Sequence, residues 1–420
     1  RNITVGQCGE AVLKAAYFNA EPRKNAEGER KDTEAAFVPC PSALSRLAMV
    51  DALSASLNVF VQKRNELKTV IAGYPWFLDW GRDTLIFLRG FIAAGHIGEA
   101  MEILAAFARF EENGTIPNII HGERAGNRDT ADAPLWMFLA AEDISQILGG
   151  NAVFSTKCGS RTLKEVLESI IANYLKGTPN GIVVDPESGL VWSPPHFTWM
   201  DTNYPAGTPR TGYPVEIQAL WIRALRFLGR PELAAKAEKS LVELFRIPGK
   251  GLADCLRAER GVPAKNAVQE DVVRPNQLFA LSLGVVEEEA LAREILAATE
   301  CLLVPGGIRS AADADTLCDM SVVDKGRTLV AAHHPYKGRY TGDEDTSRKP
   351  AYHNGTVWAW PFAMYAEAAE EYGVMTRDEA LSLLASSVEN LNTGCLCHIS
   401  EIADGDAPHA QKGCRAQAWS

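Results

Sequence analysis

The order of helical runs and long loops constrains the fold of this chain more than any other feature of its sequence. From residue 42 onward, apolar residues recur at spacings of three and four, which is typical of amphipathic helices. Gly, Pro and Asn residues separate about eleven such runs. The expected helices cover 42–67, 83–95, 97–112, 131–148, 161–176, 214–229, 231–246, 274–284, 287–302, 354–372 and 376–392, and a further helix starts near Ala416.

Short links between consecutive helices alternate with long loops. These loops, rich in Trp, Asp, Pro and Gly, lie at about 67–82, 113–130, 177–213, 303–353 and 393–415. Helices joined by short links pack antiparallel, and six such pairs closed into a ring form an (α/α)6 barrel. Long loops in a compact domain are usually functional. We therefore expect an all-α (α/α)6 barrel, a toroid of six helical hairpins, with the active-site loops on one rim.

Strands and flanking segments play a small part in this expectation. Gly181–Val184 and Leu190–Trp192 predict a short hairpin. Residues 1–41 are polar and weakly periodic, so we expect a leader or the remnant of an upstream segment. Residues 42–420 would form one helical domain, whose last helix is truncated at Ser420.

Composition excludes several classes of partner. The net charge of −11 disfavours nucleic acid and anionic membranes and suits a neutral polar substrate. No apolar run approaches the ~18 residues of a membrane helix. Nine dispersed cysteines indicate reduced thiols, and hence a cytoplasmic protein. Asp404-Gly405-Asp406 is either a turn or a cation site, but a full calcium-loop spacing does not follow, so we expect no metal and no cofactor.

The loop 73–84 has the composition of a sugar subsite. Aromatic faces cover the apolar side of a pyranose, and Asp and Arg side chains bind its hydroxyls. The alternative is a structural Asp–Arg pair among core aromatics. The side chains concerned are Tyr74, Trp76, Phe77, Asp79, Trp80, Arg82 and Asp83.

Two further loops each carry a candidate catalytic carboxyl. Asp201 follows Trp199, and an indole face that excludes water raises the pKa of a carboxyl and suits it to protonate a leaving group. Glu401 lies between Ile399 and Ile402, so it is either buried with a partner or poised for catalysis. Asp201 is alternatively a turn residue. Two carboxyls on separate loops are the composition of a glycosidase.

Four other residues lie beside these candidates. Arg210 and Glu216 follow Asp201, and Glu216 alternatively serves a helix N-terminus through the helix dipole. His353 precedes the expected helix at 354–372 and is either a capping residue or a site residue. Trp136 lies four residues after Asp132 on one helix face, and we include it among the substrate-binding residues.

Segments from residue 72 to the end resemble the C-terminal domain of glycogen debranching enzymes, the amylo-α-1,6-glucosidase part. They occur in the same order as in that family. The matching segments are 72–77, 79–84, 114–118, 198–201, 208–210, 214–217, 274–277, 352–358 without residue 354, 398–402 with 404–408, and 417–420.

The resemblance implies an (α/α)6 toroid that hydrolyses single α-1,6-linked glucose stubs on glycogen or limit dextrin. It implies that Asp201 is the general acid and Glu401 the general base of an inverting reaction, with carboxyls ~6.5–9.5 Å apart. Asp79, Arg82 and Asp83 would bind glucose hydroxyls, with Trp80, Trp199 and Trp358 as walls. Further contacts would come from Arg210, Glu216, His353 and Gln417.

Two alternatives remain open from the sequence. The first is a toroid glucosidase that acts on another α-glucoside, similar to glucoamylases, trehalases or glucosylglycerate hydrolases. The second is a glycan-binding toroid without catalytic activity. Bacterial and archaeal members of the family carry an N-terminal β-rich domain. Residues 1–41 are too short for such a domain, so we expect a fragment of a longer protein.

Overall fold

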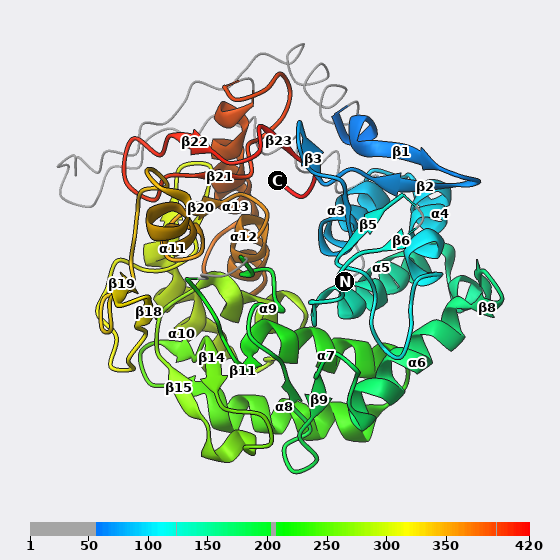
Figure 1. Ribbon diagram of the computed structural model, residues 1–420, viewed down its shortest axis with the longest axis horizontal. Coiled ribbons are helices and arrows are strands. Elements are labelled where there is room, and N and C mark those ends of the chain that lie inside the picture. Colours follow the sequence, from blue (N-terminus) through cyan, green and yellow to red (C-terminus); the bar gives the residue numbers. More distant parts are fainter. Residues whose placement is uncertain (1–55, 123, 203–206, 392) are drawn as a thin grey trace.

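A computed structural model describes residues 56–420 of the chain, except 123, 203–206 and 392. The expected leader 1–41 and the start of the expected helix 42–67 lie outside the described residues. Helices form the body of the protein and are arranged around a ring (Figure 1).

In the part of the chain that the structure describes, five helices line the inside of this ring, and each packs against the next (Figure 1). Inner helices contact neighbours on several sides, so they are buried around most of their circumference; the side chains from Val215 to Ile222 are all buried. The inner helices are α3 (Gly81–Ala93), α5 (Ala133–Leu148), α7 (Val215–Phe227), α9 (Leu278–Ser282) and α12 (Phe362–Glu371).

Five outer helices each follow an inner helix in the chain and pack against it. Their buried positions form one stripe, as in α8, where Ala234, Ala237, Leu241 and Phe245 face inward at spacings of three and four. The outer helices are α4 (Ile97–Ala108), α6 (Leu163–Lys176), α8 (Pro231–Phe245), α10 (Glu289–Thr299) and α13 (Arg377–Ala385). The core lies between the two layers.

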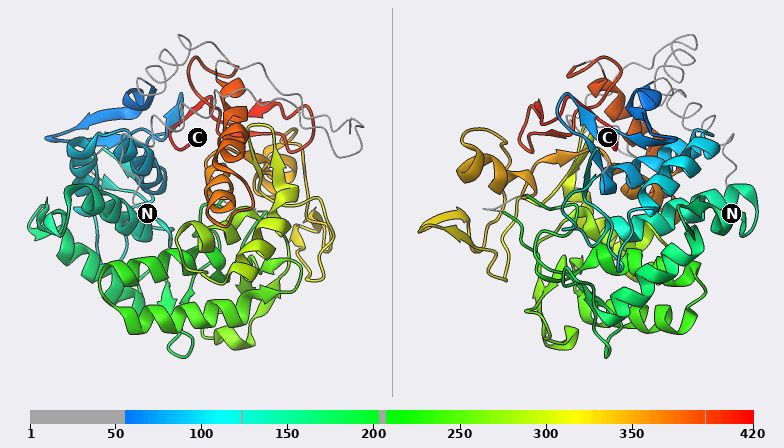
Figure 2. Two further views of the ribbon diagram at one scale, coloured as in Figure 1. Left: turned by 180° about the vertical axis from the view of Figure 1, so that it is seen from behind. Right: turned by 45° about the vertical axis from the view of Figure 1, so that its right-hand side comes forward.

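The long loops carry short strands that join distant parts of the chain. Strand β3 (Gly73–Tyr74) pairs with β23 (Ala416–Gln417), and β4 (Asp79–Trp80) pairs with β5 (Ile119–His121). A five-stranded antiparallel sheet has the order β16 (Leu303–Val304), β17 (Gly307–Arg309), β20 (Val357–Trp358), β21 (Ile402–Ala403) and β22 (Gln411–Lys412). Figure 1 looks onto the face where these loops gather, whereas the reverse view in Figure 2 shows mainly helices.

The remaining elements are shorter. The other strands are β1 (Val61–Arg64), β2 (Leu67–Val70), β6 (Arg124–Ala125), β7 (Lys157–Cys158), β8 (Arg161–Thr162), β9 (Val183–Val184), β10 (Val191–Trp192), β11 (Gly212–Pro214), β12 (Arg246–Ile247), β13 (Gly251–Leu252), β14 (Cys255–Arg257), β15 (Val268–Glu270), β18 (Val322–Asp324) and β19 (Arg327–Val330). The short helical elements are η1 (Ala152–Ser155), η2 (Ala264–Asn266), η3 (Pro275–Gln277), η4 (Glu300–Leu302), η5 (Glu344–Arg348), α11 (Lys349–Tyr352) and η6 (Ser386–Asn390).

Most expected helices are confirmed, and so is the hairpin formed by β9 and β10. Two expected helices are wrong at one end, and a third is wrong altogether. In place of the last part of the helix 42–67, β1 and β2 form a hairpin whose turn residue Asn65 has a φ of 52°. The helix 354–372 begins only at Phe362, because β-branched Thr356 and Val357 lead into β20. The expected helix at Ala416 is strand β23, which pairs with β3.

Among the described residues, every helix is too short or too polar to cross a bilayer.

Candidate active site

Arg82, in the first turn of α3, joins three separate segments on the loop face. Its Nη1 donates to Asp201 Oδ2 at 2.8 Å, and its Nε donates to Asp132 Oδ2 at 2.6 Å. Asp132 directly precedes α5, and Asp201 lies in the loop before β11. The side chains of Arg82 and Asp132 are 2% and 1% exposed, but that of Asp201 is 28% exposed. Asp201 is therefore the member of this group that solvent can reach.

The surroundings of Asp201 favour its protonated form. Burial raises its pKa above the ordinary value and outweighs the attraction of Arg82, while the charge of Asp132 raises the pKa further. Trp199, two residues earlier, donates its indole N–H to Asn276 Oδ1 at 2.7 Å. The pKa thus shifts in the expected direction, with general burial as its main cause.

Glu401, just before β21, has one hydrogen-bond donor on each carboxylate oxygen. The Tyr352 hydroxyl donates to Oε1, and the backbone N–H of Cys414 donates to Oε2 at 2.9 Å. Burial raises the pKa of Glu401, both hydrogen bonds lower it, and the charge of Asp201 raises it again. Glu401 is thus buried with partners and also lies within electrostatic range of Asp201.

Asp83 is a third carboxyl in the same place. Gln417 Nε2, on β23, donates to Asp83 Oδ1 at 2.8 Å, across 334 residues of sequence. Burial raises the pKa of Asp83 to about 8; Arg82 opposes this shift, and the charges of Asp201 and Glu401 add to it. We call Arg82, Asp83, Asp132, Asp201 and Glu401 the carboxyl cluster.

Aromatic rings from the expected set gather together. His353 stacks on Trp358 with centroids 5.2 Å apart, and Trp199 meets the edge of each at 5.5 and 5.2 Å. Burial and nearby Arg274 lower the pKa of His353 well below its usual value, so the ring is neutral. Among the described residues, its Nε2 atom is buried without a hydrogen-bond partner.

Two members of this aromatic group, Trp360 and Trp419, are not among the site residues expected from the sequence. Trp360 lies 5.0 Å from Trp199 and 6.2 Å from Trp136, and it stacks on Trp419 at 5.5 Å. Trp360 follows Trp358 by two residues, so the Trp-Ala-Trp pattern was the available signal.

Arg210 and Glu216 belong to a separate, fully buried group. Arg210 Nε donates to Asp254 Oδ2 at 2.7 Å, and its Nη2 donates to Glu216 Oε2 at 2.7 Å. Arg274 approaches Asp254 Oδ2 at 3.3 Å, and Asn276 Nδ2 donates to Asp254 Oδ1 at 2.7 Å. We call these five residues the ion network. Asp254 was missed, although it lies between apolar neighbours as Glu401 does.

The structure separates Asp79 from Arg82 and Asp83. Its carboxylate accepts hydrogen bonds from Arg64 Nε at 2.8 Å and from Thr69 Oγ1 at 3.1 Å. Trp80 is half-buried, with its ring edge-on to that of Phe77 at 6.2 Å. The carboxylate of Asp79 is therefore paired within the protein, with Arg64 and not Arg82 as its guanidinium partner.

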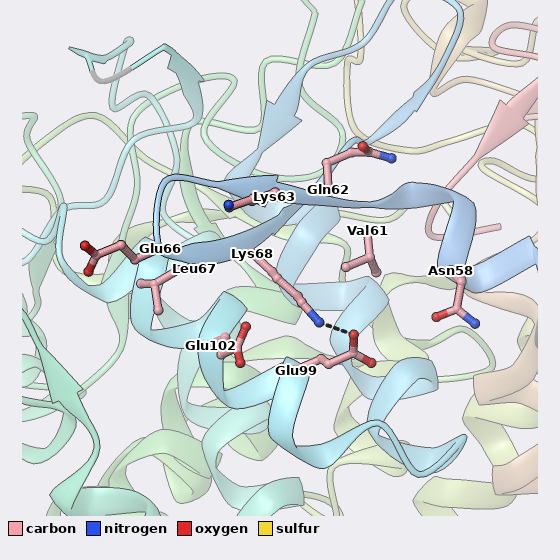
Figure 3. Close-up of a pocket in the computed structure, with 9 residues that line it drawn as sticks. All are labelled: Asn58, Val61, Gln62, Lys63, Glu66, Leu67, Lys68, Glu99 and Glu102. Atoms are coloured by element: carbon pink, nitrogen blue, oxygen red, sulfur yellow. Dashed lines mark hydrogen bonds and ion pairs between the residues drawn. The ribbon is translucent and has the colours of Figure 1, made fainter.

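A hollow of about 310 Å³ lies elsewhere, between the β1–β2 hairpin and α4 (Figure 3). The dashed line in Figure 3 marks the ion pair between Lys68 and Glu99 in this hollow. Among the described residues that line it, none offers a pyranose an aromatic face. The lining residues are Asn58, Val61, Gln62, Lys63, Glu66, Leu67, Lys68, Glu99 and Glu102.

The two carboxylates of the acidic turn at 404–406 accept hydrogen bonds from donors within the protein. The backbone N–H of Tyr340 donates to Asp404 Oδ1 at 2.8 Å, and Tyr336 Oη donates to Asp406 Oδ1 at 3.0 Å. Within the described ranges, no group of three or more His, Cys, Asp and Glu side chains is arranged to hold a metal ion.

The sequence matches a family model and a known enzyme. Residues 54–319 and 326–420 match the family model described as amylo-alpha-1,6-glucosidase. The glycogen debranching enzyme of Saccharomyces cerevisiae is 25% identical over an alignment of 412 residues. The match covers 73% of this chain and 26% of the yeast enzyme. The chain thus spans about a quarter of the length of that relative.

Two solved structures share the fold. The GH63 mannosylglycerate hydrolase of Thermus thermophilus has a TM-score of 0.55 at 13% identity, covering 87% of this chain and 97% of that one. A rhamnosidase of Klebsiella oxytoca has a TM-score of 0.51 at 15% identity, covering 89% of this chain and 62% of that one. At such identities the likeness is one of fold.

Proposed function

The chain belongs to the amylo-alpha-1,6-glucosidase family, and on that premise we propose that it releases glucose from α-1,6-linked branch stubs of glycogen or limit dextrin. The observation that carries this proposal is the carboxyl cluster, in which Asp201 and Glu401 lie within electrostatic range of each other. Two carboxyls beside one sugar are what glycoside hydrolysis requires.

In the proposed reaction, Asp201 is the general acid. Burial raises its pKa, which favours the protonated form that would donate to the glycosidic oxygen as the bond to the anomeric carbon breaks. Arg82, already in contact with Asp201, then stabilises the carboxylate that remains.

Glu401 is the general base. It removes a proton from a water molecule that attacks the anomeric carbon from the opposite face, so an α-linked glucose leaves as the β-anomer. This inverting geometry requires the two carboxyls to be ~6.5–9.5 Å apart. The hydrogen bonds from Tyr352 and Cys414 support the ionised form that a base needs.

Recognition of the glucose unit is assigned to residues around the carboxyl cluster. Asp83, Arg82 and Gln417 would bind its hydroxyls, and His353 offers an unpartnered Nε2. The walls would be Trp80, Trp136, Trp199 and Trp358. Asp79, Arg210 and Glu216 have their charges paired within the protein, so we propose that they hold the loops in position.

The same premise extends to architecture and location. We propose that residues 42–420 form an (α/α)6 toroid, of which five helical pairs are described, and that residues 1–41 are a leader or the remnant of an upstream segment. Buried thiols at Cys158, Cys255 and Cys414 fit a reducing, cytoplasmic compartment. Glycogen or a branched α-glucan would be the partner.

A substrate comparison tests the proposal. Glucose release is measured from a limit dextrin with single α-1,6-glucosyl stubs, from maltose and from trehalose, and proton NMR follows the first anomer formed. We expect release from the branched dextrin, with β-glucose appearing first. Release from maltose or trehalose alone would assign a different α-glucoside, and sugar binding without any release would indicate a non-catalytic toroid.

A further inference from the structure

The carboxylate of Glu401 is held from two directions by groups that sequence analysis did not single out. Tyr352, the last residue of α11, donates its hydroxyl to Oε1, and the Cys414 N–H donates to Oε2 at 2.9 Å. Each oxygen thus has one donor, which fixes the plane of the carboxylate. In Figure 1, α11 lies next to β20 and β21, and Glu401 directly precedes β21.

The backbone donor depends on a close approach at Gly413. This residue has a φ of +67°, and a Cβ added there would clash with Glu401 Oε2 and come within 3.1 Å of Glu401 Cβ. A glycine at this position therefore lets the chain bring the Cys414 N–H against the carboxylate.

The phenol donor is also fixed by packing. The ring of Tyr352 meets the edge of Trp358 at 5.1 Å and lies tilted against Tyr340 at 5.5 Å. Its backbone oxygen accepts a hydrogen bond from Trp358 Nε1 at 3.2 Å. Burial and the charge of Glu401 raise the pKa of Tyr352 well above its usual value, so the hydroxyl stays a donor throughout the neutral range.

The titratable groups around Glu401 act in opposite directions. The charge of Asp201 disfavours the ionised form of Glu401. The charges of Asp83 and Glu401 likewise disfavour each other. Tyr352 favours the charge. The phenol of Tyr340 and the thiol of Cys414 also lie within electrostatic range, and their pKa values are raised, so both are neutral.

We propose that Tyr352 is a positioning residue for Glu401, whose hydroxyl holds the carboxylate in one orientation and favours its ionised form. This inference rests on the proposed function, in which Glu401 is the general base. The phenol itself need not touch the sugar; it acts through Glu401, against the burial and the neighbouring carboxyls that favour the neutral acid.

Tyr352→Phe removes the hydroxyl and keeps the ring, so the variant retains the packing. Loss of one donor to a carboxylate raises the pKa of that carboxylate by about one unit. A base must be ionised, so we expect the acidic limb of the kcat/KM profile to move up by about one pH unit. On that limb kcat/KM falls about tenfold, and the loss shrinks as the pH rises.

Tyr340→Phe is the matched control, since it removes a phenol from the ring that packs on Tyr352. Its acidic limb should coincide with that of the unchanged protein. Coinciding profiles for Tyr352→Phe would overturn the inference. A shift of the basic limb instead would also overturn it, because Glu401 would then act as the acid.

A measurement independent of turnover separates this inference from the proposed function. Carboxyl carbon NMR on protein with labelled glutamate gives the titration of Glu401, assigned by the signal lost in Glu401→Gln. We expect a higher midpoint in Tyr352→Phe, even if the branched dextrin proves not to be the substrate. An unchanged midpoint would contradict the role of Tyr352, whatever the reaction.

Discussion

The carboxyl cluster and the ion network contain the same kinds of residue but differ in charge balance and access. In the ion network, two guanidinium groups, those of Arg210 and Arg274, face the carboxylates of Glu216 and Asp254, and every one of these side chains is at most 2% exposed. In the carboxyl cluster, one guanidinium, that of Arg82, faces several carboxyls, and the side chain of Asp201 is 28% exposed.

This difference supports the roles proposed for the two groups. Burial also raises the pKa of Glu216, so a raised pKa alone does not distinguish a catalytic carboxyl from a structural one. In the ion network, the guanidinium groups of Arg210 and Arg274 face the carboxylates of Glu216 and Asp254 in a closed interior. The excess of carboxyls in the carboxyl cluster favours their protonated forms, and the proposed acid–base reaction would use such protons.

The largest expected effect comes from the carboxyl cluster. Asp201→Asn and Glu401→Gln should each lower kcat by roughly 10²–10⁴-fold, because each removes one proton-transfer group. The midpoint of thermal unfolding should change little, and binding of the branched dextrin should persist. Unchanged turnover in either variant would reject the role of that residue.

The ion network should show the reverse pattern. Arg210→Met leaves the buried carboxylates of Glu216 and Asp254 without their main partner, and should lower the free energy of unfolding by about 3–5 kcal/mol. Chemical denaturation measures this change. If the variant kept its stability but lost dextrin binding, Arg210 would belong to the sugar site.

The raised pKa of Asp83 predicts that the stability of the fold depends on pH. Its pKa is about 8 in the fold and near 4 when unfolded, so between these values only the unfolded state releases the proton. The stability contributed by this group is complete below about pH 4 and is lost as the pH rises towards 8.

Asp83→Asn removes this dependence and keeps an oxygen for Gln417. The unfolding midpoint of the variant, relative to the unchanged protein, should therefore rise between about pH 5 and pH 8, by the equivalent of roughly 1.4 kcal/mol per unit of pKa shift at most. A constant difference across this range would mean that Asp83 is ionised in the fold.

The smallest effect is expected at the hollow beside α4. The side chains of Lys68 and Glu99 are 35% and 34% exposed, so Glu99→Gln should cost at most about 1 kcal/mol of stability. Glucose release should not change. Lost turnover in this variant would connect the hollow of Figure 3 to the reaction.

Local spacing predicted the helices and the hairpin of β9 and β10, but it missed the other short strands. Helices α3 to α8 lie within a few residues of the expected runs, because an amphipathic stripe is encoded every three or four residues. Strand β23 has two residues and exists through pairing with β3, at the other end of the described chain. Such a strand is too short to show an alternating pattern, so the sequence around Ala416 predicts a helix instead.

The sequence also predicted which side chains gather near Asp201 better than it predicted their partners. Asp79, Arg82 and Asp83 were expected to act together, yet they pair with Arg64, Asp201 and Gln417 respectively. The chain changes there from strand β4 to helix α3, so neighbouring side chains point in different directions. The donors to Glu401 come from Tyr352 and Cys414, and no local pattern marks either as its partner.

A crystal structure of the Glu401→Gln variant soaked with glucose tests the central claim most directly. We predict one glucose at the carboxyl cluster, within hydrogen-bond distance of Asp83 or Arg82, with its anomeric carbon facing both Asp201 and residue 401. Glucose bound only elsewhere, such as in the hollow beside α4, would contradict the assignment of this cluster as the site of hydrolysis.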